Sequence, residues 1–143
     1  MEDKIIKTTK PLQVLVIDDD NDVIHLLERM IPEFLRCNID ISQDGVQAVH
    51  CCTKKSYDII FTDYFMPHLN GHEFVEYLRS TPNPNQDTTV ILITQAHKEI
   101  NMEEEFGNEV RLLKKPINPF QLRLSLSSVL HKNDGTIPLI SEI

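Results

Sequence analysis

The sequence predicts an α/β protein with an open, doubly wound sheet of five parallel strands. Short apolar runs that are rich in Val and Ile alternate along the chain with longer stretches of helical period. These runs are apolar almost without interruption, as is typical of parallel strands that are buried on both faces. With 143 residues, of which 41% are hydrophobic, the chain is long enough to form one domain with a sizeable core.

The first strand and the first helix are expected before residue 36. The strand covers Gln13–Ile17 and ends at three consecutive aspartates. From Asp22 onward, apolar residues recur at i, i+3, i+4 and i+7, which predicts an amphipathic helix. Pro32 removes a backbone donor and crowds the preceding turn, so we expect the helix to end or kink at residues 30–31. The apolar stripe consists of Val23, Leu26, Leu27, Met30, Ile31, Phe34 and Leu35.

The middle of the chain contains further strand and helix segments. Strands are expected at residues 38–42, 58–62 and 90–93, and helices at residues 45–55 and 71–80. The first of these strands alternates apolar and polar residues, which indicates an outer position in the sheet. Asp63 follows the second strand directly, and the third ends at Thr94. Residues 97–108 are compatible with a short helix or with a loop.

The last strand and helix complete the predicted domain. The strand covers residues 111–114 and is less apolar than the others. Asn118 and Pro119 are typical of a helix N-cap and of the first helical position. The inward stripe of this helix consists of Leu122, Leu126, Val129 and Leu130. Phe120 and Leu124 fall outside this stripe, and the alternation over these residues leaves a strand as an alternative.

We expect the domain to cover residues 12–132, between an N-terminal extension at residues 1–11 and a C-terminal tail at residues 133–143. Fourteen basic and 22 acidic residues give a net charge of −8, which opposes direct binding to nucleic acid. The apolar runs are shorter than the ~18 residues that span a bilayer, and the first residues lack the apolar core of a secretory signal. No membrane partner and a cytoplasmic location are therefore expected.

The three cysteines do not form a recognisable framework. Cys51 and Cys52 are adjacent in a predicted helix, where neighbouring side chains point about 100° apart. A disulfide framework is therefore not expected. His50 beside them does not complete a zinc pattern, because sequential neighbours on a helix do not converge on one ion.

Polar residues follow the ends of four predicted strands. Asp18, Asp63, Thr94 and Lys115 are these residues, and they lie as many as 97 positions apart in the chain. The carboxyl ends of parallel strands meet at one edge of a doubly wound sheet, which is where such folds bind ligands. Any one of these residues alone would be read as a helix cap or as a solvated side chain, whereas four at one edge indicate a site.

Clustered carboxylates at this edge would need a cation. Two carboxylates about 4 Å apart repel each other by roughly 4 kcal/mol at an effective dielectric of 20. Hard oxygen ligands with open coordination positions suit Mg²⁺, which also takes phosphate oxygens as ligands. An aspartate that faces such a metal and has no general-base partner can attack phosphorus and form an acyl phosphate, and Asp63 is the candidate.

Other acidic motifs fit this sequence poorly. An EF-hand loop that begins at Asp18 needs Gly where Val23 stands and Glu where Arg29 stands. A phosphatase of the haloacid dehalogenase type needs Thr or Val where Asp22 stands, so that interpretation is weak. Glycine-rich nucleotide-binding loops are absent from the sequence.

The motifs together resemble the receiver domain of bacterial two-component response regulators, in particular stand-alone, chemotaxis-regulator-like members. The matching segments are Val14-Leu15-Val16-Ile17-Asp18-Asp19-Asp20, Asp63-Tyr64-Phe65-Met66-Pro67-His68-Leu69-Asn70-Gly71, Ile93-Thr94 and Lys115-Pro116. The resemblance covers about residues 12–131. It implies a flavodoxin-like (βα)5 fold with the strand order 2-1-3-4-5.

The resemblance also implies a metal site for Mg²⁺. Asp19 would bind the ion directly and Asp18 largely through water. Asp63 and the backbone carbonyl of Phe65 would complete the protein ligands.

In the same family, Asp63 would accept a phosphoryl group from the phosphohistidine of a histidine kinase or a phosphotransfer protein. Thr94 would donate a hydrogen bond to that group, and Lys115 would pair with its charge. Pro116 would form a cis peptide bond with Lys115, which costs only ~0.5–1 kcal/mol for proline.

Three residues depart from the usual pattern of this family. Leu112 stands where receivers carry an aromatic switch residue, and Gln95 stands where a small residue is usual. Phe65 is bulky enough to shield an acyl phosphate from water, so slow dephosphorylation is expected.

We therefore expect a single-domain receiver, because only about a dozen residues follow the last helix. It would accept a phosphoryl group on Asp63 and signal through an unknown downstream protein, without turnover of a separate substrate. The main alternative is a pseudo-receiver, which acts as a phosphorylation-independent binding module and fits Leu112 and Gln95. A small phosphohydrolase is a third hypothesis, and a homodimer is left open.

Overall fold

Within residues 10–66, 68–95 and 110–132, the parts of the chain that the computed structural model describes, five parallel strands form one sheet. The order in the sheet is β2-β1-β3-β4-β5, as the resemblance implied. The strands are β1 (Leu12–Ile17), β2 (Cys37–Ser42), β3 (Ile59–Asp63), β4 (Thr89–Thr94) and β5 (Val110–Lys114). The predicted outer position of β2 is confirmed, because it pairs with β1 at the edge.

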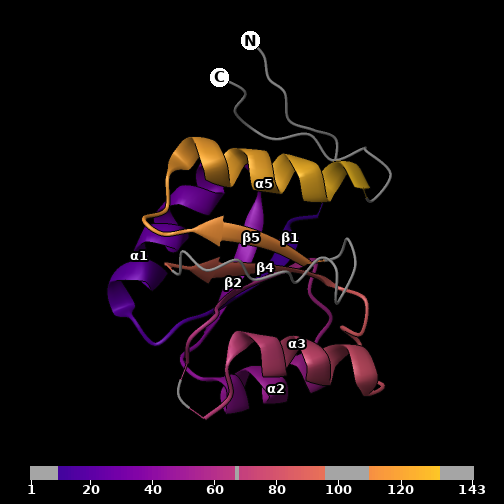
Figure 1. The fold of residues 1–143 in the computed structure, drawn as a ribbon. Helices are drawn as coiled ribbons and strands as arrows, with labels where there is room; N and C mark the ends of the chain where they lie inside the picture. Colours follow the sequence, from indigo (N-terminus) through magenta and orange to yellow (C-terminus); the bar gives the residue numbers. More distant parts are fainter. Residues whose placement is uncertain (1–9, 67, 96–109, 133–143) are drawn as a thin grey trace.

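Helices cover both faces of the sheet. They are α1 (Asn21–Met30), α2 (Gly45–Lys54), α3 (Gly71–Ser80) and α5 (Pro119–Lys132). Figure 1 shows α1 and α5 on one face and α2 and α3 on the other, so the predicted doubly wound arrangement is confirmed. The segment at residues 97–108, the tail at residues 133–143 and residues 1–9 of the extension lie outside the described residues.

The strands divide their side chains between two cores. Alternate residues of one strand face opposite helix layers, because successive side chains of a strand point to opposite faces. On the α1 and α5 side the buried strand residues are Leu12, Val14, Val16, Ile59, Phe61, Ile91, Ile93 and Leu113. On the α2 and α3 side they are Leu15, Ile17, Ile60, Val90, Leu92 and Val110. The central strands are buried on both faces, which explains their continuous apolar runs.

The helix ends follow the sequence signals. Asp20 caps α1 by accepting a hydrogen bond from the backbone N–H of Asp22. The helix ends at Met30 and continues as a 3₁₀ turn over Ile31–Glu33, so the predicted effect of Pro32 is confirmed.

Residues 119–132 are helical, and the alternative of a strand over Phe120–Leu126 is wrong. Asn118 accepts hydrogen bonds from the backbone N–H groups of Phe120 and Gln121, which begins the helix as Asn118 and Pro119 predicted. Leu122, Leu126 and Val129 are buried, whereas Leu130 belongs to the helix but its side chain lies outside the described part.

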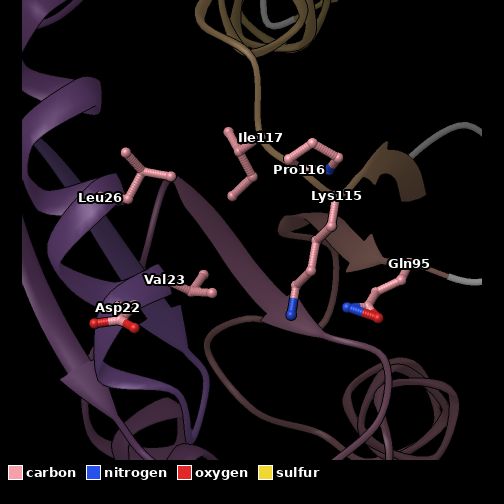
Figure 2. A pocket seen from close by; sticks show the side chains of 7 residues that line it. All are labelled: Asp22, Val23, Leu26, Gln95, Lys115, Pro116 and Ile117. Atoms are coloured by element: carbon pink, nitrogen blue, oxygen red, sulfur yellow. The ribbon is translucent and has the colours of Figure 1, made fainter.

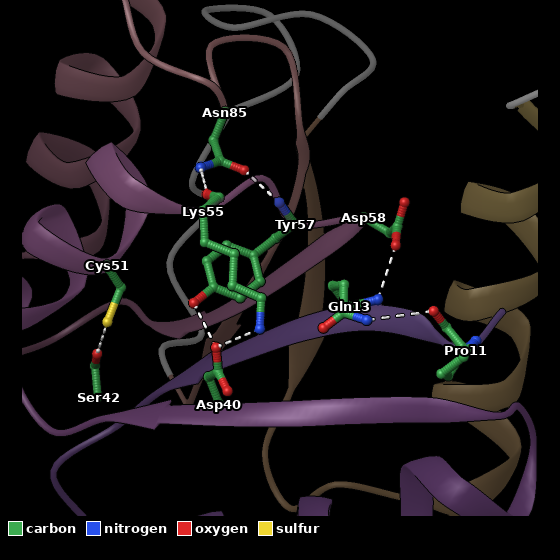
Figure 3. Close-up of polar contacts among 9 residues, drawn as sticks. All are labelled: Pro11, Gln13, Asp40, Ser42, Cys51, Lys55, Tyr57, Asp58 and Asn85. Carbon is green, nitrogen blue, oxygen red and sulfur yellow. Dashed lines mark hydrogen bonds and ion pairs between the residues drawn. The ribbon is translucent and has the colours of Figure 1, made fainter.

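A polar cluster ties α2 and the following loop to the edge strand (Figure 3). The Tyr57 hydroxyl donates a hydrogen bond to Asp40 Oδ2 at 2.7 Å, and Lys55 Nζ lies 3.0 Å from the same oxygen. Asn85 is fully buried and joins the loop from the other side. Its side chain accepts from the Tyr57 N–H at 2.7 Å and donates to the carbonyl oxygens of Cys52 and Lys55.

Replacing Tyr57 with phenylalanine should lower the free energy of unfolding by about 1.5 kcal/mol at pH 7, because the hydroxyl donates to a charged acceptor. The Tyr57 hydrogen bond is the largest cause that lowers the pKa of Asp40. The stability due to ionised Asp40 is therefore present above its ordinary pKa of 3.8 and is lost as the pH falls below it. An NMR titration of the Asp40 carboxyl should show its midpoint rising in the variant. An unchanged midpoint would contradict the assignment.

The three cysteines are free thiols. Cys52 is buried, and burial raises its pKa to about 12, so it stays protonated at neutral pH. Cys51 is half-buried, with its sulfur 3.5 Å from the Ser42 hydroxyl. Among the described helices, none has both the length and the apolar character that crossing a membrane requires.

Candidate functional site

The carboxyl edge of the sheet brings together residues from the ends of four strands. Asp63 is the last residue of β3 and pairs with Ile93 of β4, so that Thr94 lies one residue further along the edge. The Thr94 carbonyl accepts a hydrogen bond from the Lys115 N–H at 2.9 Å, which holds the end of β5 beside that of β4. Asp18 follows β1, and its N–H donates to the Ser42 carbonyl of β2 at 3.1 Å.

Three carboxylates cluster at this edge. Asp18, Asp19 and Asp63 each offer one oxygen, and these oxygens all lie within 4.8 Å of one another. Asp18 is fully buried, and its Oδ1 accepts from the Asp20 N–H at 2.9 Å. Its Oδ2 is buried but accepts no hydrogen bond from the described residues. A buried oxygen without a donor is costly, so this site fits a hard divalent cation that carboxylates bind.

Lys115 supplies positive charge to two of the carboxylates. Its Nζ lies 3.7 Å from Asp63 Oδ1 and 3.9 Å from Asp18 Oδ2, and its side chain is mostly buried. Both distances are longer than that of a close charged hydrogen bond. The ammonium group therefore lies near both carboxylates without forming a short hydrogen bond to either. The predicted convergence of Asp18, Asp63 and Lys115 is confirmed.

Burial dominates the electrostatics of both central carboxyls. Burial raises the pKa of Asp18 to about 6, and the charge of Asp63 adds to the rise, while the Asp20 N–H and Lys115 oppose it. The pKa of Asp63 is also raised. Burial is the largest cause and Asp19 adds to it, and together they outweigh the lowering by Lys115 and by the backbone N–H of Phe65. Both carboxyls therefore lie in surroundings that favour added positive charge.

The loop after β3 is held closely against its neighbours. The Gly71 N–H donates to the Tyr64 carbonyl at 2.7 Å, which closes the loop at the start of α3. A side-chain carbon at Gly71 would lie 2.8 Å from Leu92 and 3.0 Å from the Tyr64 Cα, so only glycine fits. Asn70 and Glu73 form a capping box that fixes where α3 begins. The loop thus presents Asp63 from a well-packed support.

A cavity of about 460 Å³ opens over Asp63, with Phe65, Gln95 and Lys115 as its other lining residues. The Phe65 side chain is 61% exposed and packs edge-on against Tyr64, with ring centroids 4.7 Å apart. A carboxylate that lines an open cavity, beside an ammonium group and a cluster of carboxylates that could hold a cation, can receive a phosphoryl group.

The sequence model of the response regulator receiver domain family matches residues 14–127. The chain belongs to this family. The matched range contains β2, β3, β4 and β5 and all but the first two residues of β1.

Curated relatives are similar in sequence to much of this chain. The cyclic di-GMP phosphodiesterase response regulator RpfG of Xanthomonas campestris is 30% identical over 124 residues, which cover 83% of this chain and 32% of RpfG. The first curated relatives extend well beyond the match, because the aligned part of this receiver covers only 32–50% of their length.

Solved structures show the same receiver fold. A signal receiver domain of an HD domain-containing protein from Pseudomonas fluorescens has a TM-score of 0.76 at 20% identity, covering 87% of this chain and 98% of that one. The receiver domain of the sensor histidine kinase PA1611 from Pseudomonas aeruginosa has a TM-score of 0.69 at 22% identity, covering 85% and 99%.

The remaining sequence-predicted site residues lie at the same edge of the receiver. Thr94 is buried at the last position of β4, and Asp19 is exposed beside Asp18. The Lys115–Pro116 peptide bond is cis, as predicted. The roles of Thr94 and of the Phe65 carbonyl stay predictions.

Sequence reasoning missed an apolar pocket beside Lys115, whose walls include Val23, Leu26 and Ile117. The sequence signal for this pocket is weak, because the helical period places Val23 and Leu26 in the apolar stripe of the first helix, which is expected to face the core.

Proposed function

We propose that Asp63 accepts a phosphoryl group from the phosphohistidine of a histidine kinase or of a phosphotransfer protein, and that this reaction requires Mg²⁺. The observation that carries the proposal is the clustering of Asp18, Asp19, Asp63 and Lys115, which come from distant parts of the chain. Asp63 and Lys115 also line an open cavity. Membership of the receiver family supports it. So does the likeness to a receiver described with magnesium coordinated in its active-site cleft.

Asp18, Asp19 and Asp63, together with the backbone carbonyl of Phe65, would hold the metal. When bound, Mg²⁺ neutralises charge on the carboxylates and on the phosphoryl oxygens. Asp63 attacks phosphorus with one carboxylate oxygen, and the bond from phosphorus to the donor's nitrogen breaks as that nitrogen keeps the electron pair. Lys115 pairs with the transferred group, and Thr94 donates a hydrogen bond to it. The chain supplies positioning and charge, which phosphoryl transfer chiefly needs.

Incubation with acetyl phosphate and Mg²⁺ tests this function. We expect the intact mass to increase by one phosphate group, and we expect EDTA to prevent the increase. A folded protein that gains no phosphate under these conditions, and none from a phosphorylated histidine donor, would refute the proposal.

The output of the receiver would pass through protein contacts, in the cytoplasm expected from the sequence. Phe120 and Leu124 lie one helical turn apart on α5 and are 57% and 44% exposed. Exposed apolar side chains on one helix face suit a protein partner, either a downstream target or a second copy of this chain.

A phosphorylation-independent binding module is the second candidate. It is favoured by Leu112, which is 42% exposed on β5 at the position where an aromatic switch residue is expected. Beryllofluoride, which mimics a bound phosphoryl group, should change NMR signals near Asp63 if the protein is a switch, whereas a folded protein that does not bind it would favour the binding module. Unchanged signals at β5 and α5 on its addition would favour the binding module, and changes there would favour the switch.

Replacing Phe65 with asparagine should shorten the lifetime of the Asp63 acyl phosphate on the order of tenfold, which corresponds to about 1.4 kcal/mol of barrier. The Phe65 ring lines the cavity over Asp63, so removing it admits water to the phosphoryl group. The lifetime can be followed by phosphate release after the donor is removed. The matched control is Phe120→Asn, an equally exposed aromatic position on α5 that should leave the lifetime unchanged. An equal lifetime in the Phe65 variant would contradict the shielding role.

A further inference from the structure

A second pocket of about 560 Å³ lies between α1 and the segment that joins β5 to α5 (Figure 2). Its volume falls within the ~300–1,000 Å³ that is usual for small-molecule sites. The lining residues are Asp22, Val23, Leu26, Gln95, Lys115, Pro116 and Ile117. The pocket is therefore large enough for an organic ligand of several carbon atoms.

The pocket has an apolar wall and a polar mouth. Val23, Leu26 and Ile117 are half-buried, and all three pack against the core on the α1 and α5 side. Figure 2 shows these three on one side of the Lys115 side chain and Gln95 on the other. A ligand with an apolar chain and a charged head suits this division.

The mouth of this pocket is shared with the phosphoryl site. Gln95 and Lys115 line both the apolar pocket and the cavity over Asp63. Lys115 Nζ lies 3.7 Å from Asp63 Oδ1, so a phosphoryl group beside Asp63 also lies at the entrance to the apolar pocket. Asp22 is exposed at the α1 rim, and its charge opposes an anionic head on that side. The charges therefore orient a ligand with its anionic head toward Lys115 and its chain toward the wall formed by Val23, Leu26 and Ile117.

We propose that this pocket receives the alkyl chain of an acyl phosphate longer than acetyl phosphate, and that the protein uses such acyl phosphates as phosphodonors. The inference rests on the proposed function of Asp63. In the transfer, an Asp63 oxygen forms a bond to phosphorus, and the bond from phosphorus to the acyl oxygen breaks. The departing oxygen keeps the electron pair and leaves as a carboxylate, so no proton or further reactant is needed.

The apolar wall binds the leaving group, and chain length therefore determines the reaction rate. Each methylene group that leaves water for an apolar site changes binding roughly fourfold, so the two additional methylenes of butanoyl phosphate should raise kcat/KM on the order of tenfold over acetyl phosphate. Rates of Asp63 phosphorylation by the two donors in Mg²⁺, measured by intact mass, test this. If neither donor reacts and a phosphorylated histidine donor does not react either, the proposed function fails. If only the phosphorylated histidine donor reacts, this inference alone is overturned. If acetyl phosphate reacts and butanoyl phosphate is no faster, this inference alone is overturned.

Val23→Phe should fill the pocket and bring the ratio of the butanoyl to the acetyl rate close to one. The matched control is Val46→Phe, because Val46 is 65% exposed on α2 at the other face of the sheet, and it should keep the tenfold ratio. Ile117→Ala removes part of the wall without adding bulk, and it should lower the ratio severalfold if Val23→Phe does not fold. A ratio that no pocket variant changes would overturn the inference.

Binding of unreactive analogues gives a readout that is independent of transfer. Butylphosphonate should shift the methyl NMR signals of Val23, Leu26 and Ile117, and its three additional methylene groups should make it bind roughly sixtyfold more tightly than methylphosphonate. Equal affinities, with no shift of these methyl signals, would overturn the inference. If the pocket variants slow transfer only from a phosphohistidine protein, the pocket serves a protein donor and the inference is also overturned.

Discussion

Replacing Asp63 with asparagine should abolish covalent phosphorylation by acetyl phosphate and Mg²⁺, with a loss of at least about a hundredfold in rate. The amide oxygen of asparagine is nearly the same size but is a poor nucleophile toward phosphorus, and its charge is absent. Asp63 is the last residue of β3 and lines the cavity, and its Oδ1 lies 3.7 Å from the Lys115 Nζ. No other described carboxylate has both this contact and this position. Intact-mass spectrometry measures the modified fraction.

Asp87→Asn is the matched control for this experiment. Asp87 is exposed in the loop between α3 and β4 and lines a different cavity, so its replacement should leave phosphorylation unchanged. A phosphate group that still appears on the Asp63→Asn protein would place the acceptor elsewhere. Circular dichroism of both variants establishes that they fold.

Replacing Asp18 with asparagine should raise the free energy of unfolding by about 3 kcal/mol at pH 7.5 in the absence of divalent cations. Burial raises the pKa of Asp18 from 3.8 to about 6, so the folded chain binds a proton more tightly than the unfolded chain does. The contribution of Asp18 to stability therefore falls as the pH rises from about 4 to about 6, and above that range its charge destabilises the fold. Asparagine removes the charge and keeps an oxygen for the Asp20 N–H.

Urea denaturation in EDTA at pH 7.5 and at pH 4 measures this effect. The difference between the variant and the wild type should shrink to about 0.5 kcal/mol at pH 4, where Asp18 is protonated in the folded wild type and partly protonated in the unfolded chain. Asp87→Asn should change stability by less than about 0.5 kcal/mol at both pH values, because its side chain is exposed. A variant that is less stable than the wild type at pH 7.5 would contradict the electrostatic account.

Mg²⁺ should stabilise the wild type more than the Asp18→Asn protein. At ten times its dissociation constant, a ligand that binds only the folded state raises stability by about 1.4 kcal/mol. The wild type should gain this amount, and the Asp18→Asn protein should gain less, because it has lost one carboxylate of the cluster. Repulsion among the clustered carboxylates destabilises the fold, and a bound cation reduces this repulsion. Metal binding is therefore coupled to folding.

Much of the site could be predicted from the sequence because of one property of parallel sheets. Asp18, Asp63 and Lys115 each follow an apolar run, and the ends of such runs share an edge. The structure confirms their meeting, with the Lys115 ammonium within 3.9 Å of both carboxylates. The order of the strands in the sheet could not be predicted from the local sequence pattern. It was predicted from the family resemblance.

Other contacts could not be predicted, because they depend on how elements dock. Tyr57 and Asp40 are 17 residues apart, and their hydrogen bond exists only because the loop after α2 returns beside β2. Asn85 is fully buried, and its side chain forms hydrogen bonds with three residues that lie 28, 30 and 33 positions away in the chain. The local sequence does not indicate which residues so far apart in the chain come into contact.

The sequence by itself determined the alternation of strands and helices, the helix caps and the residues at the carboxyl edge, since these depend on hydrophobic period and on short-range hydrogen bonds. Only the tertiary structure decided which side chains line a common space. The apolar pocket beside Lys115 is formed by α1 and by the segment after β5, whose residues are about 90 positions apart. Such a pocket exists because side chains from two separately docked elements leave a volume unfilled, and packing of that kind is a property of the assembled fold.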